Sequence, residues 1–412
     1  MTTKPNKLRL PTGRGARATS NYNVTRALPA AALNRWTKNM NTCIYTRCEF
    51  ESASGEHILQ NSLGARWTDS TIACDDIQQK FGDIIDVAVA DSLNGFRTLL
   101  GTLGGRGGSP PPIKNVEDQQ GKSYYLTSGG QPSLARPAVE VNYRDDGTAE
   151  VHIQLGNKNQ MGWALHILRE QHPNLKVDSE AVAQSAENSR DHLDSPLHLQ
   201  FGIGGPEFFR GILKAVFNLL GATHRDVALS SALDALRGFI VDGKGDSDSF
   251  VGWPTAHDPL PLPRLGAHDH FLAVWSRGGT VGGFIQLFGE FPFVFRFGAG
   301  VECEDFCASY LVNPHRDTKS SEIRSHDFDP SCLPIFENCP HLPGPDVWEA
   351  HRIRTERFLA EYRRRTEAKV IHDIIEEVLG PKDGEIITRE DADEIHERIM
   401  KFVKYKLGLK GS

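Results

Sequence analysis

The sequence has no long hydrophobic run: no stretch stays apolar over the roughly 20 residues that a membrane-spanning helix needs. Its N-terminus also lacks the short apolar core and small-residue cleavage site of a secretory signal, although composition leaves an Arg-rich organelle presequence open. These two absences predict a cytoplasmic protein without membrane contact. Apolar residues make up 39% and charged residues 24% of the chain, which are ordinary proportions for a globular protein.

Cysteine is also sparse, and its number is odd. Seven cysteines are spread along 412 residues. A disulfide framework is typical of short chains with an even number of cysteines, so we expect reduced thiols and an intracellular address. A single core rarely grows to this chain length, and the sequence therefore predicts two or three folding units.

Acidic residues are absent from one end of an otherwise acidic chain. The formal net charge is −7, yet residues 1–40 contain eight Lys or Arg and no Asp or Glu. Residues 1–37 show no helical or strand period, which predicts a basic, disordered arm. Such an arm can bind phosphates on an acidic protein, because local rather than net charge sets the attraction.

Apolar periodicity predicts the first elements after this arm. We expect a short strand at Cys43–Thr46, a second short element ending at Glu56–Leu59, and a helix from Asp75 to about Leu93. A Gly-rich segment at 101–109, followed by three prolines, fits no regular element. We therefore place a domain boundary there.

The middle of the chain predicts a mixture of strands and helices. Val139–Tyr143 and Ala149–Leu155 alternate on either side of a turn, which is typical of a hairpin. His270–Phe297 predicts a second β unit with a turn at 278–279. Pro206–Leu220 predicts a helix that is largely buried against these strands, with proline in its first turn.

The chain ends in helical patterns. Asp346 to Leu379 is charged and amphipathic, and a second helix begins at Thr388, with Asp391 three residues on resembling a capping box, and stops at Gly408. The predicted fold class is α+β. Its predicted parts are the arm (1–37), an N-terminal domain (38–108), a larger mixed α+β domain (109–345) and a helical C-terminal region (346–412).

Glu56 and His57 are the residues best suited to chemistry. Hydrolysis of a phosphodiester needs a base that activates water and a cation that holds the phosphate. At a strand end the chain can turn so that the carboxylate holds a metal ion while the imidazole faces water. A helix about twenty residues later can bring Gln78 to the same ion. Taken alone, a Glu-His pair is more often two surface residues.

The sequence around this pair resembles the HNH (ββα-metal) endonuclease family. Three blocks carry the resemblance in order: C-I-Y-T at 43–46, E-H-I-L-Q-N-S-L-G-A at 56–65, and C-D-D-I-Q-Q-K-F-G with I-D at 74–86. The related branch of the family has C-I-x-C/T, E-H-I-hydrophobic-x-x-x-L-G-G and C-N-x-x-F-G-x-x-I-D. The resemblance covers about residues 43–93, and it implies that the N-terminal domain has the ββα-metal fold.

The resemblance assigns roles to single residues. It implies that His57 is the general base, that Glu56 is the first metal ligand, and that Gln78 takes the helix position usually filled by Asn or His. Ser70 or Thr71 falls where a middle polar residue orients the base. The implied cofactor is Mg²⁺ or another divalent cation.

A second metal of the family is not expected here. Many members bind a structural zinc ion with two C-x-x-C pairs, but Thr46 and Ile77 take the second position of each pair. Four thiolates cannot meet at this site, so no structural zinc is expected in the HNH domain. Cys43 and Cys74 are then expected to be small core residues.

Four residues are candidates for nucleic-acid contact: Arg66, Trp67, Lys80 and Arg106. Arg66 and Trp67 combine a cation with a stacking surface near the expected site, although Trp67 suits the core almost equally well. Arg106 lies in the Gly-rich segment. That segment lacks the spacing of a phosphate-binding loop and better fits a hinge.

The expected function is therefore that of a metal-dependent endonuclease with a nucleic-acid partner, DNA being the expected substrate. A homo-oligomer stays open. Two alternatives remain: a catalytically silent HNH-like protein that only binds nucleic acid, favoured by Gln78 and the missing zinc, and a sensor or interaction protein led by its middle domain.

Overall fold

The structure is a computed structural model, and the basic arm (1–37) and Arg106 lie outside the residues that it describes. The described residues belong to one compact unit, Met40–Ser412. None of the described helices is both long and apolar enough to cross a membrane. The structure describes residues 40–104, 107–175, 178, 180, 182, 193, 195–256, 266–315, 322–325, 328–380 and 387–406.

The N-terminal part of this unit has two pairs of very short strands. The pairs are antiparallel and are β1 (Asn41–Thr42) with β2 (Glu49–Phe50), and β3 (Glu56–His57) with β4 (Thr68–Asp69). The strand expected at Cys43–Thr46 is wrong. These residues form a turn, because the Cys43 N–H donates to the Cys48 carbonyl and the Arg47 N–H donates to the Cys43 carbonyl.

Two helices, α1 (Asp75–Asp83) and α2 (Ile85–Ser92), stand where one was expected, and a third, α3 (Asn94–Leu100), begins after the predicted end. The first break falls at Ile84, whose backbone leaves the helical region at φ −122° and ψ −71°. The buried residues keep a four-residue spacing across it, from Ile77 and Phe81 to Ile85 and Val89. The spacing of apolar residues in the sequence therefore did not indicate the break in the helix.

A group of small antiparallel sheets comes next. β5 (Ile113–Glu117), β6 (Ser123–Thr127) and β7 (Gln131–Leu134) form one sheet. The predicted hairpin is confirmed as β8 (Ala138–Tyr143) and β9 (Ala149–Gln154), and α4 (Met161–Gln171) follows it.

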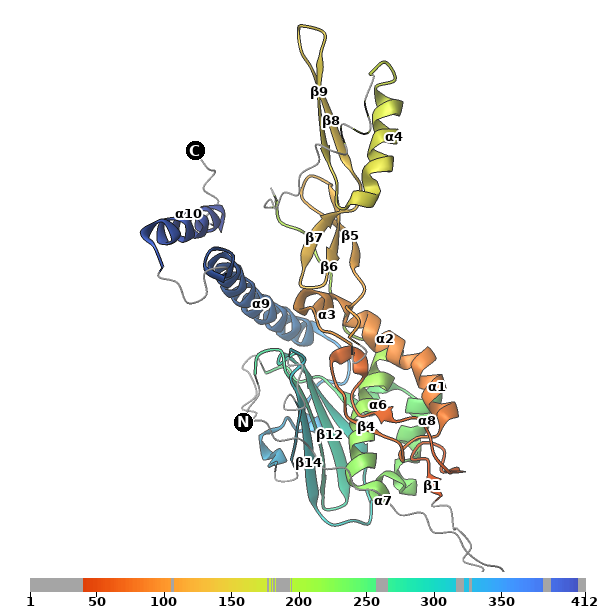
Figure 1. Cartoon of the computed structure of the whole chain (residues 1–412). Coiled ribbons are helices and arrows are strands. Elements are labelled where there is room, and N and C mark those ends of the chain that lie inside the picture. Colours follow the sequence, from red (N-terminus) through yellow and green to blue (C-terminus); the bar gives the residue numbers. More distant parts are fainter. Residues whose placement is uncertain are drawn as a thin grey trace, which may run out of the picture. The chain divides into compact units, whose positions relative to one another are not determined.

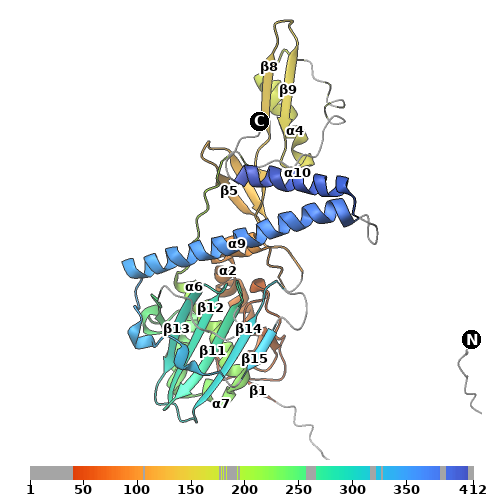
Figure 2. The ribbon, with the colours of Figure 1, turned by 90° about the vertical axis from the view of Figure 1, so that its left-hand side faces the viewer.

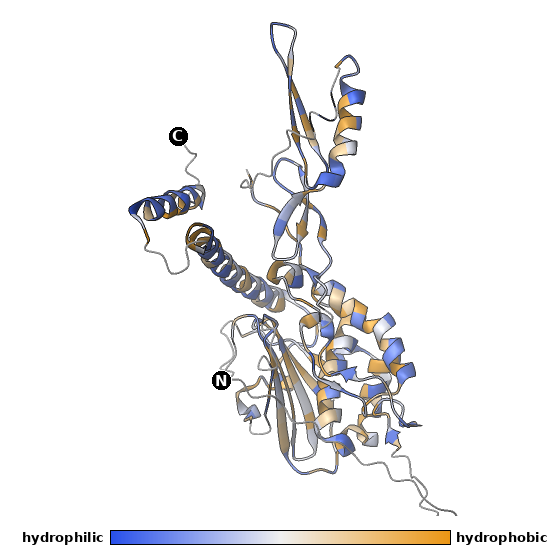
Figure 3. Ribbon diagram, viewed as in Figure 1, coloured by the Kyte–Doolittle hydropathy of each residue, from blue (hydrophilic) through white to orange (hydrophobic). Residues whose placement is uncertain are grey.

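The largest sheet has six antiparallel strands in the order β10-β13-β12-β11-β14-β15. Figure 2 shows the strands from β13 to β15 side by side. The expected β unit is confirmed, with its turn at Gly278 and Gly279, where both backbones have positive φ. Hydrophobic residues predominate along these strands (Figure 3). The strands are β10 (Val251–Gly252), β11 (His270–Arg277), β12 (Thr280–Leu287), β13 (Phe291–Gly298), β14 (Phe306–Val312) and β15 (Glu322–Ser325).

The predicted buried helix is confirmed as α6 (Pro206–Thr223), which lies between this sheet and the N-terminal helices (Figure 1). Every residue from 208 to 221 is buried. At Gly211 a side chain would meet Val89 Cγ2 at 2.4 Å, so glycine allows α2 to approach α6 closely. Two further helices follow, α7 (Arg225–Ala228) and α8 (Asp234–Asp242).

The C-terminal helices are confirmed as α9 (Pro345–Leu379) and α10 (Arg389–Lys406). On α9, Arg352 pairs with Glu349 and Glu356 within the helix, at spacings of three and four residues. The capping box is also present. The Thr388 N–H and hydroxyl both donate to Asp391 Oδ2, and the Asp391 N–H donates to the Thr388 hydroxyl.

The apolar core is continuous across the predicted boundary near residue 108. Phe81, Val89 and Phe96 belong to the same buried cluster as Phe217 of α6 and Phe295 of β13. The second buried cluster of the described residues lies on the other face of the sheet and contains no residue before 271. The N-terminal segment is therefore held by α6 rather than by a core of its own.

Candidate active site

A buried ion cluster lies where β3, α2 and α6 meet. Lys214 of α6 places its Nζ atom 2.5 Å from Glu56 Oε1, 2.7 Å from Asp86 Oδ2 and 2.9 Å from Asp86 Oδ1. The Lys214 and Glu56 side chains are only 2% and 7% exposed. The ammonium group thus has three carboxylate contacts, which is what a buried charge needs to remain charged.

Asn218 lies one turn further along α6 and fixes β3 against this helix. Its Nδ2 donates to the His57 carbonyl oxygen at 2.8 Å and to Glu56 Oε1 at 3.2 Å. Its Oδ1 accepts the hydroxyl of the buried Tyr45. Residues four apart share one face of a helix, so Lys214 and Asn218 reach the Glu56–His57 strand together.

The charges of the cluster do not balance. Glu56 and Asp86 are two carboxylates and Lys214 is one ammonium, which leaves a net charge of −1 when all three are ionised. Burial raises the pKa of Glu56, and the Lys214 ammonium only partly opposes this. Burial alone would lower the pKa of Lys214, but Glu56 and Asp86 outweigh burial and raise it. The cluster therefore attracts positive charge.

A depression of about 240 Å³ opens beside the cluster. Glu56, His57, Gln60 and Asp86 contribute to its wall, together with Asn61, Ser62, Gly82, Val87 and Ala90. The volume holds several water molecules, since each takes about 30 Å³ in the liquid. The structure therefore brings the predicted Glu56–His57 pair to one recess and adds Asp86 to it.

Gln60 supplies a further oxygen at this recess. Its side chain is buried, and its Nε2 donates to the Gly211 carbonyl at 2.9 Å and to Asp86 Oδ1 at 3.2 Å. These two acceptors fix the orientation of the amide. Its Oε1 is buried and accepts no hydrogen bond from any residue that the structure describes. A buried acceptor in this state needs water or a cation.

Gln78, the expected helix ligand, is engaged elsewhere. Its Nε2 donates to the carbonyls of Ser54 at 2.6 Å and Ala73 at 2.9 Å, and its Oε1 accepts the Ser54 hydroxyl at 2.8 Å. Gln78 does not line the depression. It connects the loop before β3 to the start of α1, and both of its amide atoms are used in doing so.

Thr71, one of the two residues expected to orient the base, forms hydrogen bonds with a residue close to it in the sequence. Thr71 donates its hydroxyl and its N–H to Asp69 Oδ1, at 2.7 and 2.8 Å. Arg225 of α7 donates to the same hydroxyl at 3.3 Å. Thr71 therefore stabilises the end of β4.

Two of the candidate nucleic-acid contacts lie along the edge of the large sheet. The Arg66 N–H donates to Glu322 Oε1 at 2.6 Å, and the Arg66 residue is exposed. Trp67 is half-buried, with its ring edge-on to Tyr310 at a centroid distance of 5.0 Å. The Arg324 guanidinium lies 3.9 Å from the centre of the Trp67 ring. A nucleic-acid base would have to displace this arginine to stack on the same face.

Lys80 forms a surface ion pair. Its Nζ lies 2.8 Å from Asp242 Oδ1, and both side chains are 38% exposed. Solvent screens such a pair, so Lys80 remains accessible to a phosphate. Arg106, the fourth candidate, lies outside the described residues.

Sequence reasoning missed Lys214, Asn218 and Tyr45, and it gave Gln60 no role. Lys214 and Asn218 did leave a signal. They are polar residues four apart in a stretch that is otherwise apolar from Gly211 to Ala222, and a buried lysine requires an anionic partner. Their partners come from a segment more than 120 residues earlier, which no local pattern identifies.

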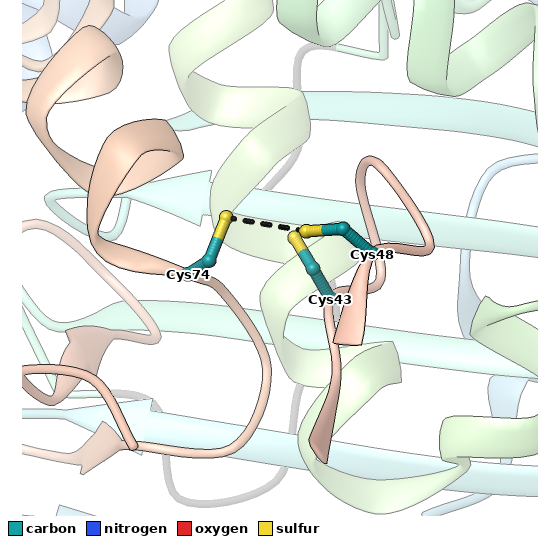
Figure 4. A group of neighbouring side chains, drawn as sticks. All are labelled: Cys43, Cys48 and Cys74. Carbon is teal, nitrogen blue, oxygen red and sulfur yellow. Dashed lines mark hydrogen bonds between the residues drawn. The ribbon is translucent and has the colours of Figure 1, made fainter. Parts of the chain in front are cut away.

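Three cysteines meet on another part of the N-terminal segment. The sulfur atoms of Cys43, Cys48 and Cys74 all lie within 4.8 Å of one another (Figure 4). Cys43 is fully buried, as expected for a small core residue, whereas Cys74 is half-buried and Cys48 is exposed. The expectation that no zinc site forms here considered only the C-x-x-C positions and left out Cys48.

The described elements make this a mixed α+β protein, as the sequence predicts. No protein-family model matches the chain, and searches of the curated proteins and of the solved structures return no match. The likeness to HNH endonucleases therefore depends on the residues of the motif and on their surroundings.

Proposed function

We propose that the chain is a metal-dependent endonuclease whose active site is the depression lined by Glu56, His57 and Asp86. One observation carries this proposal. A base and two carboxylates from β3 and α2 converge on one recess, while α6 fixes their positions. The order β3, β4, α1 around the site also fits the strand-strand-helix unit that the motif resemblance implies.

The oxygen atoms at the recess suit a hard divalent cation. The residues that would hold it differ from the expected pair of Glu56 and Gln78. Glu56 and Gln78 do not fit as a pair, because both amide atoms of Gln78 are bonded to Ser54 and Ala73. Glu56, Asp86 and Gln60 Oε1 do fit, since Mg²⁺ prefers carboxylate and amide oxygens. When bound, the ion supplies the positive charge that holds a phosphate.

The net charge of the site makes a cation necessary for this activity. A phosphodiester is an anion, and the cluster of Glu56, Asp86 and Lys214 has a net charge of −1 when all three groups are ionised. Lys214 does not reverse this charge, because it is buried behind the carboxylates. An anionic substrate therefore approaches the recess favourably only when a further cation is present.

His57 is the base in this proposal. Its residue is half-buried at the wall of the recess, and Asn218 holds its backbone carbonyl. A neutral imidazole accepts a proton from water near neutral pH, which is the step that creates the nucleophile.

A second function competes with this one: a catalytically silent protein that binds nucleic acid. The observation in its favour is Lys214, whose ammonium already pairs with both Glu56 and Asp86, the two carboxylates that a metal ion would need. If Lys214 replaces the metal permanently, the recess cannot activate water on a bound phosphate. Cleavage and binding must therefore be measured separately.

The decisive experiment compares plasmid cleavage by the wild type and by His57→Ala, in Mg²⁺ or Mn²⁺ and with a chelator. Loss of a general base should reduce the rate by about 10²- to 10⁴-fold. His166→Ala is the matched control, because His166 is an exposed histidine on α4. Circular dichroism and plasmid binding should stay unchanged in both variants. Chelator-resistant cleavage, or a His57→Ala rate equal to that of wild type, would reject the assignment.

A second comparison tests the ligand set. Asp86→Asn should raise the Mg²⁺ concentration needed for half-maximal cleavage, because it removes a carboxylate from the recess. If the wild type binds plasmid but cleaves it with none of the metal ions tested, the protein is a catalytically silent nucleic-acid-binding protein.

A further inference from the structure

We propose that Cys43, Cys48 and Cys74 form a three-thiolate site for a thiophilic metal ion, Zn²⁺ being the expected occupant. This proposal is independent of the endonuclease proposal, because none of these cysteines lines the depression. The site has three protein ligands and differs from a four-thiolate site, which Thr46 and Ile77 exclude.

The sulfur geometry fits a zinc ion. Cys48 Sγ and Cys74 Sγ lie 3.8 Å apart, and all three sulfurs lie within 4.8 Å of one another. In a tetrahedral site with Zn–S bonds of about 2.3 Å, the sulfurs lie about 3.8 Å apart. Figure 4 shows the Cys74 side chain pointing from the start of α1 toward the two cysteines of the β1–β2 turn. Small side-chain movements therefore suffice to close the site around an ion.

The backbone, rather than chance, brings these thiols together. The Cys43 N–H donates to the Cys48 carbonyl at 2.9 Å, and Arg47 adopts a left-handed backbone with φ 57°. This turn returns the chain so that Cys48 comes back beside Cys43. Gln78 donates to the Ala73 carbonyl at 2.9 Å, which fixes the peptide next to Cys74. Preformed ligand positions reduce the ordering cost of binding an ion.

The ionisation of Cys43 and the ionisation of Cys74 affect each other. Burial opposes ionisation of Cys43, but the Thr46 hydroxyl and nearby backbone groups outweigh it, so the pKa of Cys43 is lowered. Burial raises the pKa of Cys74 to about 11, and the neighbouring Cys43 adds to the rise. Thiols this close compete to ionise, because each thiolate repels the next. A divalent ion removes that repulsion and allows all three to coordinate.

The fourth coordination position is open to solvent. The Thr46 hydroxyl lies 2.9 Å from Cys48 Sγ, but a neutral hydroxyl is not one of the usual zinc ligands. Cys48 itself is exposed, so water can complete the tetrahedron. Thiolates select soft or borderline ions, and the site is therefore expected to discriminate against Mg²⁺. A bound ion would connect the β1–β2 turn to the start of α1.

The test uses the reduced full-length protein, stripped of metal with a chelator and titrated with Zn²⁺. We expect one ion per chain at this site, and an intense thiolate-to-metal charge-transfer band when Co²⁺ replaces Zn²⁺. Cys48→Ser should weaken binding by more than the roughly 10- to 100-fold seen on loss of an outer hydrogen-bond partner. Cys48 is exposed, so this variant should keep the thermal midpoint of the metal-free wild type.

Cys332→Ser is the matched control, since Cys332 is a half-buried cysteine outside the cluster. It should bind Zn²⁺ as the wild type does. Cys74→Ser provides a second ligand variant and should lose the charge-transfer band as Cys48→Ser does. Two results would overturn the proposal: wild-type affinity in Cys48→Ser, or a Cys48–Cys74 disulfide in place of bound metal when the protein is purified without reductant and with zinc.

Discussion

Two buried polar regions of this molecule meet the cost of burial in opposite ways. The cluster of Glu56, Asp86 and Lys214 pairs its ionised groups with one another. His268, just before β11, and His270, its first residue, are buried but are not in an ion pair that the structure describes. Burial lowers the pKa of His268 to about 4 and that of His270 to about 3, so both imidazoles stay neutral at neutral pH.

The ion cluster is therefore a candidate for binding charged groups, whereas the two histidines support the fold. His270 Nδ1 accepts the Phe288 N–H at 3.1 Å, which fixes the end of β12. Its ring is fully buried, out of reach of a substrate. The ion cluster instead borders a recess, and its net charge is −1 when its three groups are ionised. A perturbed group at a recess is a candidate for function, whereas a neutral core histidine is a structural group.

The largest effect should come from removing the cation of the cluster. Lys214→Met leaves the buried Glu56 carboxylate without its cation, beside Asp86, whose side chain is 29% exposed. This change should lower the free energy of unfolding by about 3–5 kcal/mol. Lys80→Met is the matched control, because its pair with Asp242 is partly exposed and should contribute at most about 1 kcal/mol. Urea unfolding at pH 7 measures both.

A double variant sharpens this result. Adding Glu56→Gln to Lys214→Met removes one of the two stranded carboxylates, and stability should partly recover. If Lys214→Met has the same free energy of unfolding as Lys80→Met, the ion pairs of the cluster do not stabilise the protein. The proposed difference between the cluster and the two histidines would then be wrong.

Lowering the pH should reduce the free energy of unfolding through His270. The pKa of His270 is about 3 in the folded protein and near 6.5 when unfolded. Between these pH values the unfolded chain binds more protons than the folded protein. The contribution of His270 to the free energy of unfolding is therefore fully present above about pH 6.5 and is lost as the pH decreases. For this one residue the loss approaches about 1.4 kcal/mol per pH unit well below 6.5.

Unfolding free energies at pH 7 and pH 5 check this loss. His270→Asn keeps an acceptor near the Nδ1 position but does not titrate, so it should reduce the dependence on pH. The exposed His166→Asn should leave it unchanged. An equal pH dependence in His270→Asn and the wild type would mean that His270 is not held neutral by burial.

The sequence predicted those elements whose signals are local. The α6 helix, the β8–β9 hairpin and the Thr388 capping box follow from periodicity, turn residues and cap chemistry. The break at Ile84 was missed because the spacing of buried residues continues through it. The turn at Cys43–Thr46 was missed because a short apolar run does not distinguish a strand from a turn.

The candidate site divides in the same way. Glu56 and His57 are adjacent and belong to a motif, so the sequence was sufficient to propose them. Asp86 lies eight residues after Gln78 and near the same helix face, which left a supporting role and a solvated or capping role equally open. Lys214 and Asn218 reach the site from α6, and this long-range contact depends on Gly211 allowing α2 and α6 to approach.

A smaller effect is expected at the edge of the ion cluster. Tyr45→Phe removes the hydroxyl that donates to Asn218 Oδ1 and leaves a buried acceptor without its partner. The loss should be about 1–3 kcal/mol in unfolding free energy. Tyr143→Phe is the control, because Tyr143 is exposed and its change should be close to zero. A similar loss in both variants would show that Asn218 does not depend on Tyr45.

The smallest effect is expected at Gln78, where the motif and the structure give different roles. As a connector between Ser54 and Ala73, Gln78 makes three partly exposed hydrogen bonds, and Gln78→Ala should lower the free energy of unfolding by about 1–2 kcal/mol. Gln78→Asn is shorter by one methylene and should lose part of the same contacts. Neither change should alter the Mg²⁺ concentration needed for half-maximal cleavage, because Asp86 and Gln60 occupy the recess instead. Asp86→Asn, measured in parallel, should alter that concentration. If Gln78→Ala raises the metal requirement as much as Asp86→Asn does, Gln78 is a ligand as the motif predicts. Its bonds to Ser54 and Ala73 must then open when the metal binds.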